Sequence, residues 1–353
     1  MPILRILLLP FSCLYALATD LRNRMFDWGI KKTTAFDPFI ISVGNITAGG
    51  TGKTPFVELL IRLLKDRYTV AVLSRGYRRQ TKGFVLADAT ANAKSIGDEP
   101  FQYYSKFGRE IAVAVGEKRA LAIPRLIAKI NKLEVIILDD AFQHRSVARD
   151  LDILLSDYHR PFYKDAVLPA GLLRESRRHA KRADVVVVTK CPHELALKEK
   201  ESIIQQIGKY GGREKPVFFT GVTYLKPQKL YGNQQFSKNV VLFSGIANAD
   251  QFENYVDKHF NLVTHKRYPD HYSFTQDDIR ELIAIFDEVT FDEKCLLTTE
   301  KDMVRLLGMK EGDGLDTYPV FYLPIELYFT ENGDFFANYL NSRMEEEINR
   351  QAH

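Results

Sequence analysis

A glycine-rich stretch that follows an apolar run constrains the fold of this chain more than any other feature. Residues 44–54 read GNITAGGTGKT, directly after the apolar segment 39–43. A glycine-rich turn between a strand and a helix exposes backbone N–H groups to phosphate, and a lysine and threonine behind it reach the outer phosphates and a metal ion. The stretch therefore predicts a nucleoside triphosphate site. Its spacing departs from GxxxxGK[ST], because Thr47 stands where the first glycine is expected.

The segments on either side of this stretch alternate between helical and strand patterns. Apolar side chains in residues 54–65 have helical spacing, and residues 69–73 then favour a strand, which together predict a βαβ unit. Further short apolar runs recur at residues 111–115, 135–138, 151–155 and 185–188. Nearly continuous apolar strands are typical of a parallel sheet that is covered on both faces. The first two hundred residues are therefore expected to form one doubly wound, RecA-like domain.

A second α/β pattern begins after a β-rich junction near residue 216. Strand-like and helix-like segments alternate at residues 240–243, 250–259, 262–265, 277–289, 295–298 and 320–323. We expect an α/β fold in which a P-loop, RecA-like parallel-sheet domain is joined by β-rich linkers to a smaller α/β domain, with the active site in the cleft between them. The expected divisions are an N-terminal helix region (1–35), the P-loop core (36–215), a β-rich linker (216–236), the C-terminal α/β domain (237–316), and a return linker with a C-terminal helix (317–353).

The charge balance and the cysteines exclude some classes of protein. With 49 basic and 45 acidic side chains, the formal net charge of +4 is too balanced to indicate nucleic acid binding. Cys13, Cys191 and Cys295 are odd in number and far apart, so they suggest neither a disulfide framework nor a CxxC metal site. A reducing compartment fits this pattern best.

The N-terminal segment allows more than one interpretation. Residues 3–18 combine Arg5 with a leucine-rich run and end in a motif similar to a secretory cleavage site. A nucleotide site about twenty residues downstream argues against export, and the apolar run is shorter than the roughly 20 residues that span a bilayer. We expect the segment to lie in an anionic membrane surface, and an ordinary buried helix is the alternative. Basic residues that would face the headgroups are Arg5, Arg22, Arg24, Lys31 and Lys32.

Two groups of residues are suited to nucleotide chemistry. Lys53 would neutralise the β- and γ-phosphates, and the Thr54 hydroxyl would contact Mg²⁺. Backbone groups of the loop would hold the phosphates at Gly49, Gly50, Thr51 and Gly52. The apolar run 135–138 ends in Asp139 and Asp140, a Walker-B arrangement whose carboxylates hold Mg²⁺ directly or through water. A solvated turn is the alternative for an isolated Asp-Asp pair.

Other nucleotide-binding classes match the sequence less well. A GTPase would carry an aspartate in its base-reading motif, but residues 188–192 read VTKCP, with Pro192 in that position. Partitioning ATPases of the ParA and MinD type carry a lysine directly before the glycine pair, where this chain has Ala48. A membrane-associated ATPase of that kind remains the second hypothesis, and it predicts ATP hydrolysis without a phosphorylated lipid product.

Eight motifs, in this order along residues 42–302, resemble those of one enzyme family. They read SVGNITAGGTGKTP, LSRGY, GDEP, LDDAFQH, LPAGLLRE, VVTK, PDHY and TTEKD. The chain is similar in all of them to the tetraacyldisaccharide 4'-kinases, the lipid A 4'-kinases of Gram-negative bacteria, and the position of Thr47 is part of that family's loop. The resemblance implies transfer of the ATP γ-phosphoryl group to the 4'-hydroxyl of an acylated disaccharide 1-phosphate, at the cytoplasmic face of the inner membrane.

The resemblance also implies roles for residues that the patterns alone leave open. Asp98, in GDEP, is the favoured base, with His271, in PDHY, as its dyad partner; without the family, GDEP is a turn before a helix. Glu175, in LPAGLLRE, resembles a further magnesium-associated carboxylate, and Arg174 beside it would contact phosphate; the alternative is a surface ion pair. His144 is a weaker candidate that is equally compatible with a structural role.

The lipid substrate gives a possible purpose to a basic run and to three further residues. Arg174, Arg177, Arg178, His179, Lys181 and Arg182 suit the substrate's 1-phosphate or an anionic lipid, although such runs are commonly solvated helix faces. Arg75, Tyr77 and Arg119 are expected to line the site. The partners expected are thus the lipid substrate and an anionic membrane surface, with no nucleic acid and no obligate protein partner inferred.

Overall fold

The computed structural model describes residues 2–308 and 314–351, except that the side chains of 2–4 and 347–351 are left out. In these residues the larger sheet has nine strands in the order β14-β8-β7-β6-β1-β5-β2-β4-β3. Its pairings are parallel except for β3 with β4 and β14 with β8. The strands are β1 (Phe39–Gly44), β2 (Val70–Ser74), β3 (Val85–Leu86), β4 (Ala112–Val115), β5 (Val135–Asp139), β6 (Leu151–Asp157), β7 (Val185–Thr189), β8 (Val217–Tyr224) and β14 (Ile325–Phe329).

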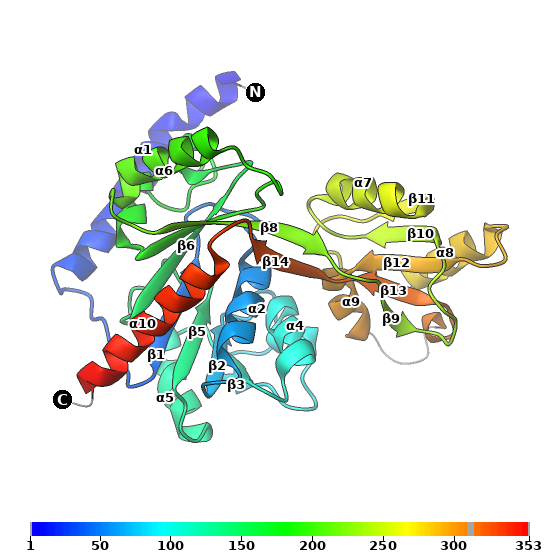
Figure 1. Cartoon of the computed structure of the whole chain (residues 1–353), viewed down its shortest axis with the longest axis horizontal. Helices are drawn as coiled ribbons and strands as arrows, with labels where there is room; N and C mark the ends of the chain where they lie inside the picture. Colours follow the sequence, from blue (N-terminus) through cyan, green and yellow to red (C-terminus); the bar gives the residue numbers. More distant parts are fainter. Residues whose placement is uncertain (1, 309–313, 352–353) are drawn as a thin grey trace.

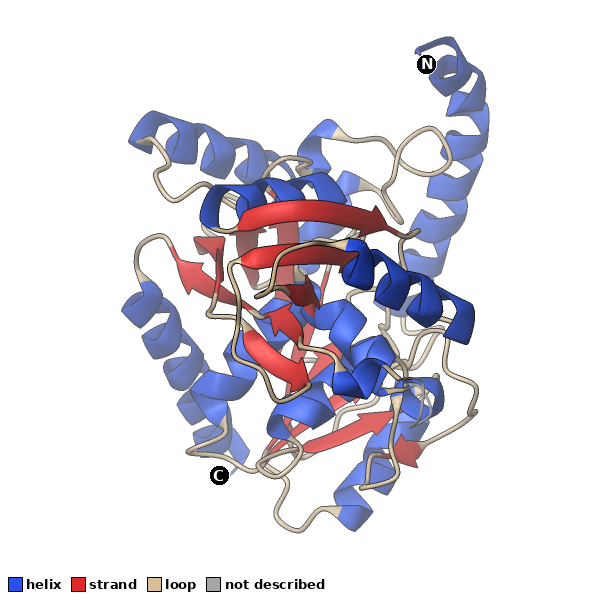
Figure 2. Ribbon diagram, turned by 90° about the vertical axis from the view of Figure 1, so that its right-hand side faces the viewer, coloured by secondary structure: helices blue, strands red, loops and turns tan. Residues whose placement is uncertain are grey.

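Helices cover both faces of this sheet, as expected for strands that are apolar throughout (Figures 1 and 2). One face packs against Phe56 and Leu60 of α2, Tyr103 of α4 and Leu340 of α10. The other face packs against α5 and α6. The helices of this domain are α1 (Pro2–Asp27), α2 (Lys53–Leu64), α3 (Ala93–Ile96), α4 (Asp98–Phe107), α5 (Arg119–Lys129), α6 (Leu197–Gly211) and α10 (Gly333–Gln351), with 3₁₀ turns η1 (Phe162–Lys164) and η2 (Arg177–Arg182).

A smaller α/β domain contains the second sheet, in the order β11-β10-β12-β13-β9. Its pairings are parallel except for β9 with β13. The strands are β9 (Gln228–Tyr231), β10 (Asn239–Ser244), β11 (Asn261–Arg267), β12 (Cys295–Thr299) and β13 (Val320–Leu323); the helices are α7 (Ala249–His259), α8 (Gln276–Glu288) and α9 (Glu300–Leu307), with the turn η3 (Leu315–Thr317). The mixed α/β fold with a parallel-sheet core is therefore the one predicted.

The chain crosses between the domains twice, on two antiparallel neighbours. β8 leads into the smaller domain and β14 returns from it, with Tyr224 opposite Ile325 and Thr220 opposite Phe329 (Figure 1). The predicted linker 216–236 thus contains β8, which pairs with the edge strand β14 of the larger sheet, and β9, an edge strand of the smaller one. The predicted C-terminal tail belongs to α10, whose Phe336, Leu340 and Met344 are buried against the larger sheet.

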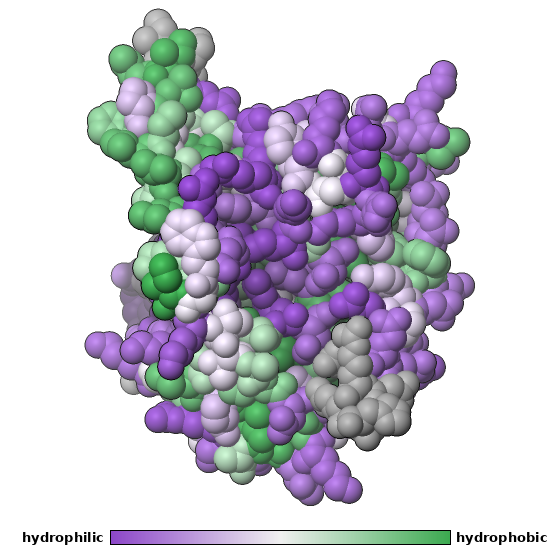
Figure 3. All heavy atoms as spheres, turned by 90° about the vertical axis from the view of Figure 1, so that its left-hand side faces the viewer, coloured by the Kyte–Doolittle hydropathy of each residue, from purple (hydrophilic) through white to green (hydrophobic). Residues whose placement is uncertain are grey.

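Helix α1 projects from the larger domain (Figure 1). It continues through Pro10, and side chains such as Leu7, Phe11, Leu14 and Leu17 are exposed. Figure 3 shows these apolar side chains as a protruding column beside a largely hydrophilic surface. Among the residues that the structure describes, no helix is both long enough and apolar enough to cross a membrane.

Candidate active site

The phosphate loop connects the end of β1 to the start of α2. Gly49 and Gly52 have φ angles of 111° and 77°, which only glycine adopts without strain. Gly52 directly precedes α2, so Lys53 and Thr54 occupy its first turn. Because the first N–H groups of a helix lack intrahelical partners, this end of α2 is suited to an anion.

Neighbouring strands brace this loop from outside. The Thr189 hydroxyl, at the end of β7, donates to the Thr51 carbonyl oxygen over 2.9 Å, and the Asn45 amide donates to the Thr51 hydroxyl over 2.6 Å. The Lys190 ammonium donates to the Gly50 carbonyl oxygen over 2.5 Å. The motifs GN and VVTK that contain Asn45 and Lys190 are visible in the sequence, but their contact with the loop is not.

Two consecutive carboxylates lie where β5 ends beside the loop. The Asp139 side chain is buried and accepts a hydrogen bond from the Ser74 hydroxyl over 3.1 Å. Asp140 has an unusual φ of 47°, its Oδ1 lies 3.5 Å from the Lys53 ammonium, and Arg174 donates to both of its oxygens over 3.0 and 3.1 Å. Strand β5 therefore brings predicted metal-binding groups to the predicted phosphate lysine.

The two carboxylates differ in their ionisation. Burial, followed by the negative charge of Asp140, raises the pKa of Asp139 to about 6. Burial also opposes ionisation of Asp140, but the positive charges of Lys53 and Arg174 outweigh it and hold the pKa of Asp140 below its ordinary value. Asp140 is therefore readily ionised, whereas the ionised form of Asp139 would be stabilised by an added positive charge.

Arg119 lies beneath this pair, at the start of α5. Its side chain is 1 % exposed and donates to the carbonyl oxygens of Gly116 over 2.6 Å and of Asp139 over 3.2 Å. Burial lowers the pKa of Arg119 to about 10, so it stays charged at neutral pH. Burial, helped by the charges of Arg119 and Arg75, lowers the pKa of His144 to about 4. His144 is therefore neutral at physiological pH.

A second polar cluster joins the two domains. Asp98 is the first residue of α4, and its Oδ2 lies 3.9 Å from Nδ1 of His271, which follows β11 in the smaller domain. His271 has a φ of 58°, and its ring lies edge-on to the exposed ring of Tyr77 with centroids 6.4 Å apart. Arg305 of α9 donates to Asp98 Oδ2 over 3.0 Å. The predicted Asp–His pair is thus together, and Arg305 makes the direct hydrogen bond.

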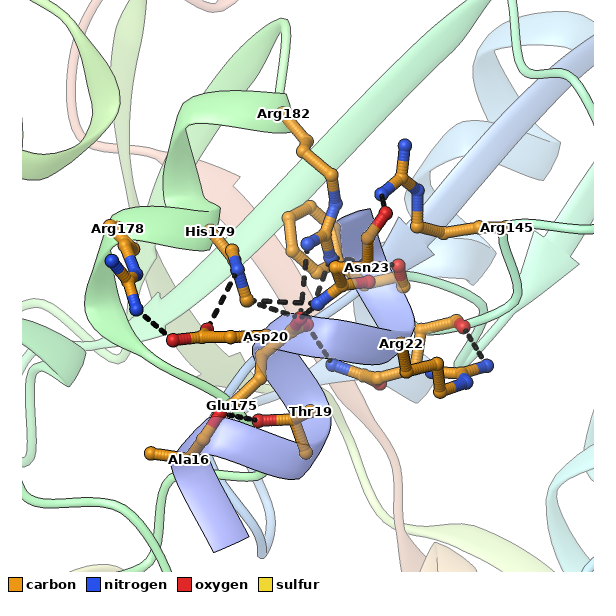
Figure 4. A network of polar contacts seen from close by, with 12 residues as sticks. Ala16, Thr19, Asp20, Arg22, Asn23, Arg145, Glu175, Arg178, His179 and Arg182 are labelled. Atoms are coloured by element: carbon orange, nitrogen blue, oxygen red, sulfur yellow. Dashed lines mark hydrogen bonds and ion pairs between the residues drawn. The ribbon is translucent and has the colours of Figure 1, made fainter. Parts of the chain in front are cut away.

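Glu175 lies in a buried network that faces α1 (Figure 4). Its carboxylate accepts hydrogen bonds from Asn23 over 3.0 Å, from Gln143 over 2.8 Å and from Arg182 over 2.9 and 3.0 Å, and lies 2.9 Å from His179 Nδ1. Burial opposes its ionisation, but His179 and Arg182 hold the pKa of Glu175 well below its usual range. These partners already occupy the carboxylate that the sequence predicts to be associated with magnesium.

The basic run from Arg177 onward forms η2, and several of its members are paired within the protein. Arg178 makes an ion pair with Asp20 of α1, and His179 Nε2 lies 3.1 Å from the same carboxylate (Figure 4). Arg177 donates to the Asp165 carbonyl oxygen over 2.7 Å. The run therefore anchors α1 to the larger domain, and it is not a uniformly solvated helix face.

Similarity to known proteins shows the family to which this chain belongs. The model of the family described as tetraacyldisaccharide-1-P 4'-kinase matches residues 4–345. The chain belongs to this kinase family. A tetraacyldisaccharide 4'-kinase from Flavobacterium psychrophilum is 42 % identical over 355 residues, covering 97 % of this chain and 98 % of that protein. The one from Bacteroides fragilis strain YCH46 is 41 % identical over 339 residues, covering 92 % and 89 %.

A solved structure of a family member has the same fold. LpxK from Aquifex aeolicus, in complex with ATP, is 29 % identical and superposes with a TM-score of 0.74 over 97 % of this chain and 99 % of that one. Both the sequence matches and the fold therefore support membership in the kinase family and not among the partitioning ATPases.

Proposed function

We propose that this kinase transfers the γ-phosphoryl group of ATP to the 4'-hydroxyl of an acylated disaccharide 1-phosphate, with Mg²⁺ as its cofactor. The observation that carries the proposal is that the phosphate-loop Lys53 lies 3.5 Å from Asp140, while a further carboxylate, Asp98, is faced by His271 of the other domain at 3.9 Å. Phosphoryl transfer needs charge neutralisation, positioning and a proton acceptor, and these groups are suited to all three.

The nucleotide end of the reaction depends on the loop and α2. Backbone N–H groups of residues 49–52 and the start of α2 would hold the phosphates, and Lys53 would offset their charge. ATP as the phosphoryl donor is supported by the ATP complex of the Aquifex aeolicus protein. The buried Arg119 would add fixed positive charge beneath the acidic pair.

The chemistry of Thr54, Asp139 and Asp140 fits a divalent cation. Hard oxygen donors are the ligands that Mg²⁺ prefers, and a cation beside Asp139 would offset the burial and repulsion that raise its pKa to about 6. When bound, Mg²⁺ would neutralise developing charge on the phosphates. Glu175 would serve as a further ligand only after giving up contacts to Arg182 or Gln143.

The acceptor hydroxyl would lose its proton to Asp98. Burial opposes ionisation of Asp98, but His271 and Arg305 together hold the pKa of Asp98 below its ordinary value, so it is ionised and able to accept a proton at neutral pH. His271 would orient the carboxylate from the smaller domain. Contact between the domains would also exclude water and limit hydrolysis of ATP.

We propose that α1 holds the enzyme on the cytoplasmic face of the inner membrane. Its exposed apolar side chains would enter the headgroup region, close to the basic run. A cavity of about 250 Å³ beside η2 is lined by Arg177 and Arg178, together with Tyr210 and Leu173. This combination of charge and apolar surface suits a phosphorylated lipid headgroup, including the 1-phosphate of the substrate.

One experiment separates this kinase from a membrane-associated ATPase. The protein is incubated with Mg-ATP and acylated disaccharide 1-phosphate in detergent, and mass spectrometry follows the lipid. Addition of one phosphate at the 4'-position is expected, and Lys53→Ala should reduce its rate by at least about 10²-fold. ATP hydrolysis by folded protein without a phosphorylated lipid would favour the ATPase.

A further inference from the structure

The side chain in direct contact with the proposed base belongs to the other domain. Arg305 lies on α9, is buried, and donates from Nε to Asp98 Oδ2 over 3.0 Å. His271 Nδ1 lies 3.9 Å from the same oxygen, beyond hydrogen-bonding distance, and 3.4 Å from Arg305 Nη2. The guanidinium therefore contacts both members of the dyad.

Arg305 is held in place by its own domain. Its Nη1 donates to Asp302 Oδ1 over 2.8 Å and to the Gly245 carbonyl oxygen over 2.9 Å. Asp302 is fully buried and accepts hydrogen bonds from the Gly245 N–H over 3.0 Å and from the Thr299 hydroxyl over 2.7 Å. Because these contacts fix the guanidinium plane, Arg305 presents its Nε to Asp98 in one orientation.

Apolar packing accompanies this contact. Met303 and Val304, the residues that precede Arg305 on α9, pack in one buried cluster with Ile96 and Phe101 of the larger domain. The hydrogen bond to Asp98 thus forms only where α9 meets α4. Its geometry depends on the same surfaces that bring the two domains together.

We propose that Arg305 is a positioning residue, which orients the Asp98 carboxylate and makes that orientation depend on contact between the domains. The inference rests on the proposed role of Asp98 as the base. Arg305 acts through Asp98 and need not touch the substrate. A planar guanidinium bound at three points can fix one carboxylate oxygen while the second remains available to the acceptor hydroxyl.

Several charged groups surround Asp98, and Arg305 is the cation in hydrogen-bonding contact with it. Glu99 follows it on α4, and His271 faces it from the loop after β11, with the Asp270 carboxylate 3.9 Å from the His271 ring. Asp302 pairs with Arg305 on α9. Arg78 approaches from the larger domain, where it donates to the His271 carbonyl oxygen over 3.4 Å. Loss of Arg305 would therefore leave Asp98 among these acidic groups without its hydrogen-bonded cation and make it harder to ionise.

The test compares Arg305→Met and Arg305→Lys in the full-length enzyme, with steady-state kinetics across pH. For Arg305→Met we expect kcat to fall by about 10²-fold, as for loss of a correctly placed base. The acidic limb of the kcat/KM profile should move to higher pH, while ATP affinity is unchanged. Arg305→Lys should keep the limb near its wild-type position and lose about tenfold in kcat, because it retains charge without the planar fork.

Controls separate this role from a structural one. Arg280→Met removes an exposed arginine of the same domain, paired with Asp277 over 2.7 Å, and should leave kinetics unchanged. A folded Arg305→Met enzyme with an unshifted acidic limb, or an Arg305→Lys enzyme with wild-type kcat, would overturn the inference. If Arg305→Met does not fold, Arg305→Lys decides the question alone.

Asp98→Asn distinguishes failure of this inference from failure of the proposed function. It should reduce kcat by at least about 10²-fold while ATP affinity is retained. Near-normal turnover by Asp98→Asn would remove Asp98 as the base, and with it the role of Arg305. Loss of turnover in Asp98→Asn, together with wild-type behaviour of both Arg305 variants, would overturn the role of Arg305 alone.

Discussion

Asp139 and Asp140 are adjacent in the chain, yet the pKa of Asp139 is raised above the ordinary value for aspartate and that of Asp140 is lowered below it. Asp139 ends a buried strand and faces another carboxylate, whereas Asp140 turns towards Lys53 and Arg174. The difference comes from surroundings that distant segments supply, since the two residue types are identical. The carboxylate of Asp139 would gain from a nearby cation, whereas Lys53 and Arg174 beside Asp140 are the groups suited to an anionic phosphate.

Replacing Lys53 tests the phosphate loop directly. Lys53→Ala should reduce turnover by at least about 10²-fold, because a fixed positive charge at the transferring phosphate is lost. The measurement is the rate of lipid phosphorylation. Lys65→Ala is the matched control, since Lys65 follows the far end of α2 and pairs with Glu110. Equal losses in both variants would show that the effect is not specific to the loop.

Gly44 and Gly50 should respond differently to the same substitution. A Cβ at Gly44 would lie 2.7 Å from the Phe142 nitrogen and 2.8 Å from the Phe142 Cβ, whereas one at Gly50 would have no atom within 4 Å. Gly44→Ala should therefore cost about 1–3 kcal/mol in the free energy of unfolding, and Gly50→Ala close to nothing. Denaturant titration of the nucleotide-free protein measures both. A stable Gly44→Ala variant would mean that Phe142 shifts freely.

Helix α1 is attached along one side and bare along the rest. The Ser12 hydroxyl accepts from the Ala170 N–H over 2.9 Å, and Asp20 and Asn23 join the network at η2. Polar contacts therefore fix the helix to the larger domain and leave its apolar side chains outward. This arrangement suits a helix that is held by the protein and enters a lipid surface.

Charged substitutions on α1 should weaken membrane binding. Leu14 and Leu17 are 65 % and 64 % exposed, so the double change Leu14→Asp and Leu17→Asp should leave the fold intact. Each leucine contributes about 1.5–3 kcal/mol when buried, so binding to vesicles with anionic lipid should fall more than about tenfold. Vesicle cosedimentation measures it. Leu121→Asp, at a leucine of α5 that is 63 % exposed, is the control. Unchanged binding of the double variant would argue against α1 as the membrane contact.

The two domains meet through charge as well as apolar packing. Lys106 of α4 lies 2.7 Å from Glu58 of α2 and also pairs with Glu300 of α9. Both glutamates are buried. Burial, followed by the charge of Glu58, raises the pKa of Glu300 above its ordinary value. Lys106 thus forms ion pairs with two carboxylates where the smaller domain contacts the larger.

Stability should depend on pH through Glu300. Because its pKa is raised by folding, its stabilising effect is complete below the unfolded-state value of about 4.3 and is lost as pH rises through the higher folded-state value. Glu300→Gln should therefore be more stable than wild type at pH 8, by on the order of 1 kcal/mol, with the difference vanishing near pH 4. Thermal unfolding across pH measures this. Glu281→Gln, an exposed glutamate of α8, should show no such trend. A less stable Glu300→Gln variant at pH 8 would mean that the Lys106 ion pair outweighs the cost of burial.

Much of the fold and part of the candidate site could be predicted without coordinates. Apolar runs predicted most strands between β1 and β13 at nearly their observed positions, because strand and helix periodicity are local properties. The short strands β3 and β9 were not predicted. The loop before Lys53 and the acids that end β5 were also predicted, since parallel strands present their carboxyl ends at one edge. The Asp98–Arg305 hydrogen bond, which joins residues 207 positions apart, had no comparable local signal.

The surroundings of Glu175 and Asp98 show which properties of this protein its sequence determines and which depend on the tertiary structure. The sequence determined the phosphate loop, the acidic strand end, the apolar helix and the family, because these follow from residue type and short spacing. Only the folded chain decided that Glu175 lies among Arg182, His179 and Asn23, and that Arg305 contacts both Asp98 and His271. Ion pairs and hydrogen bonds depend on distance in space, and the packing of two domains against each other sets that distance.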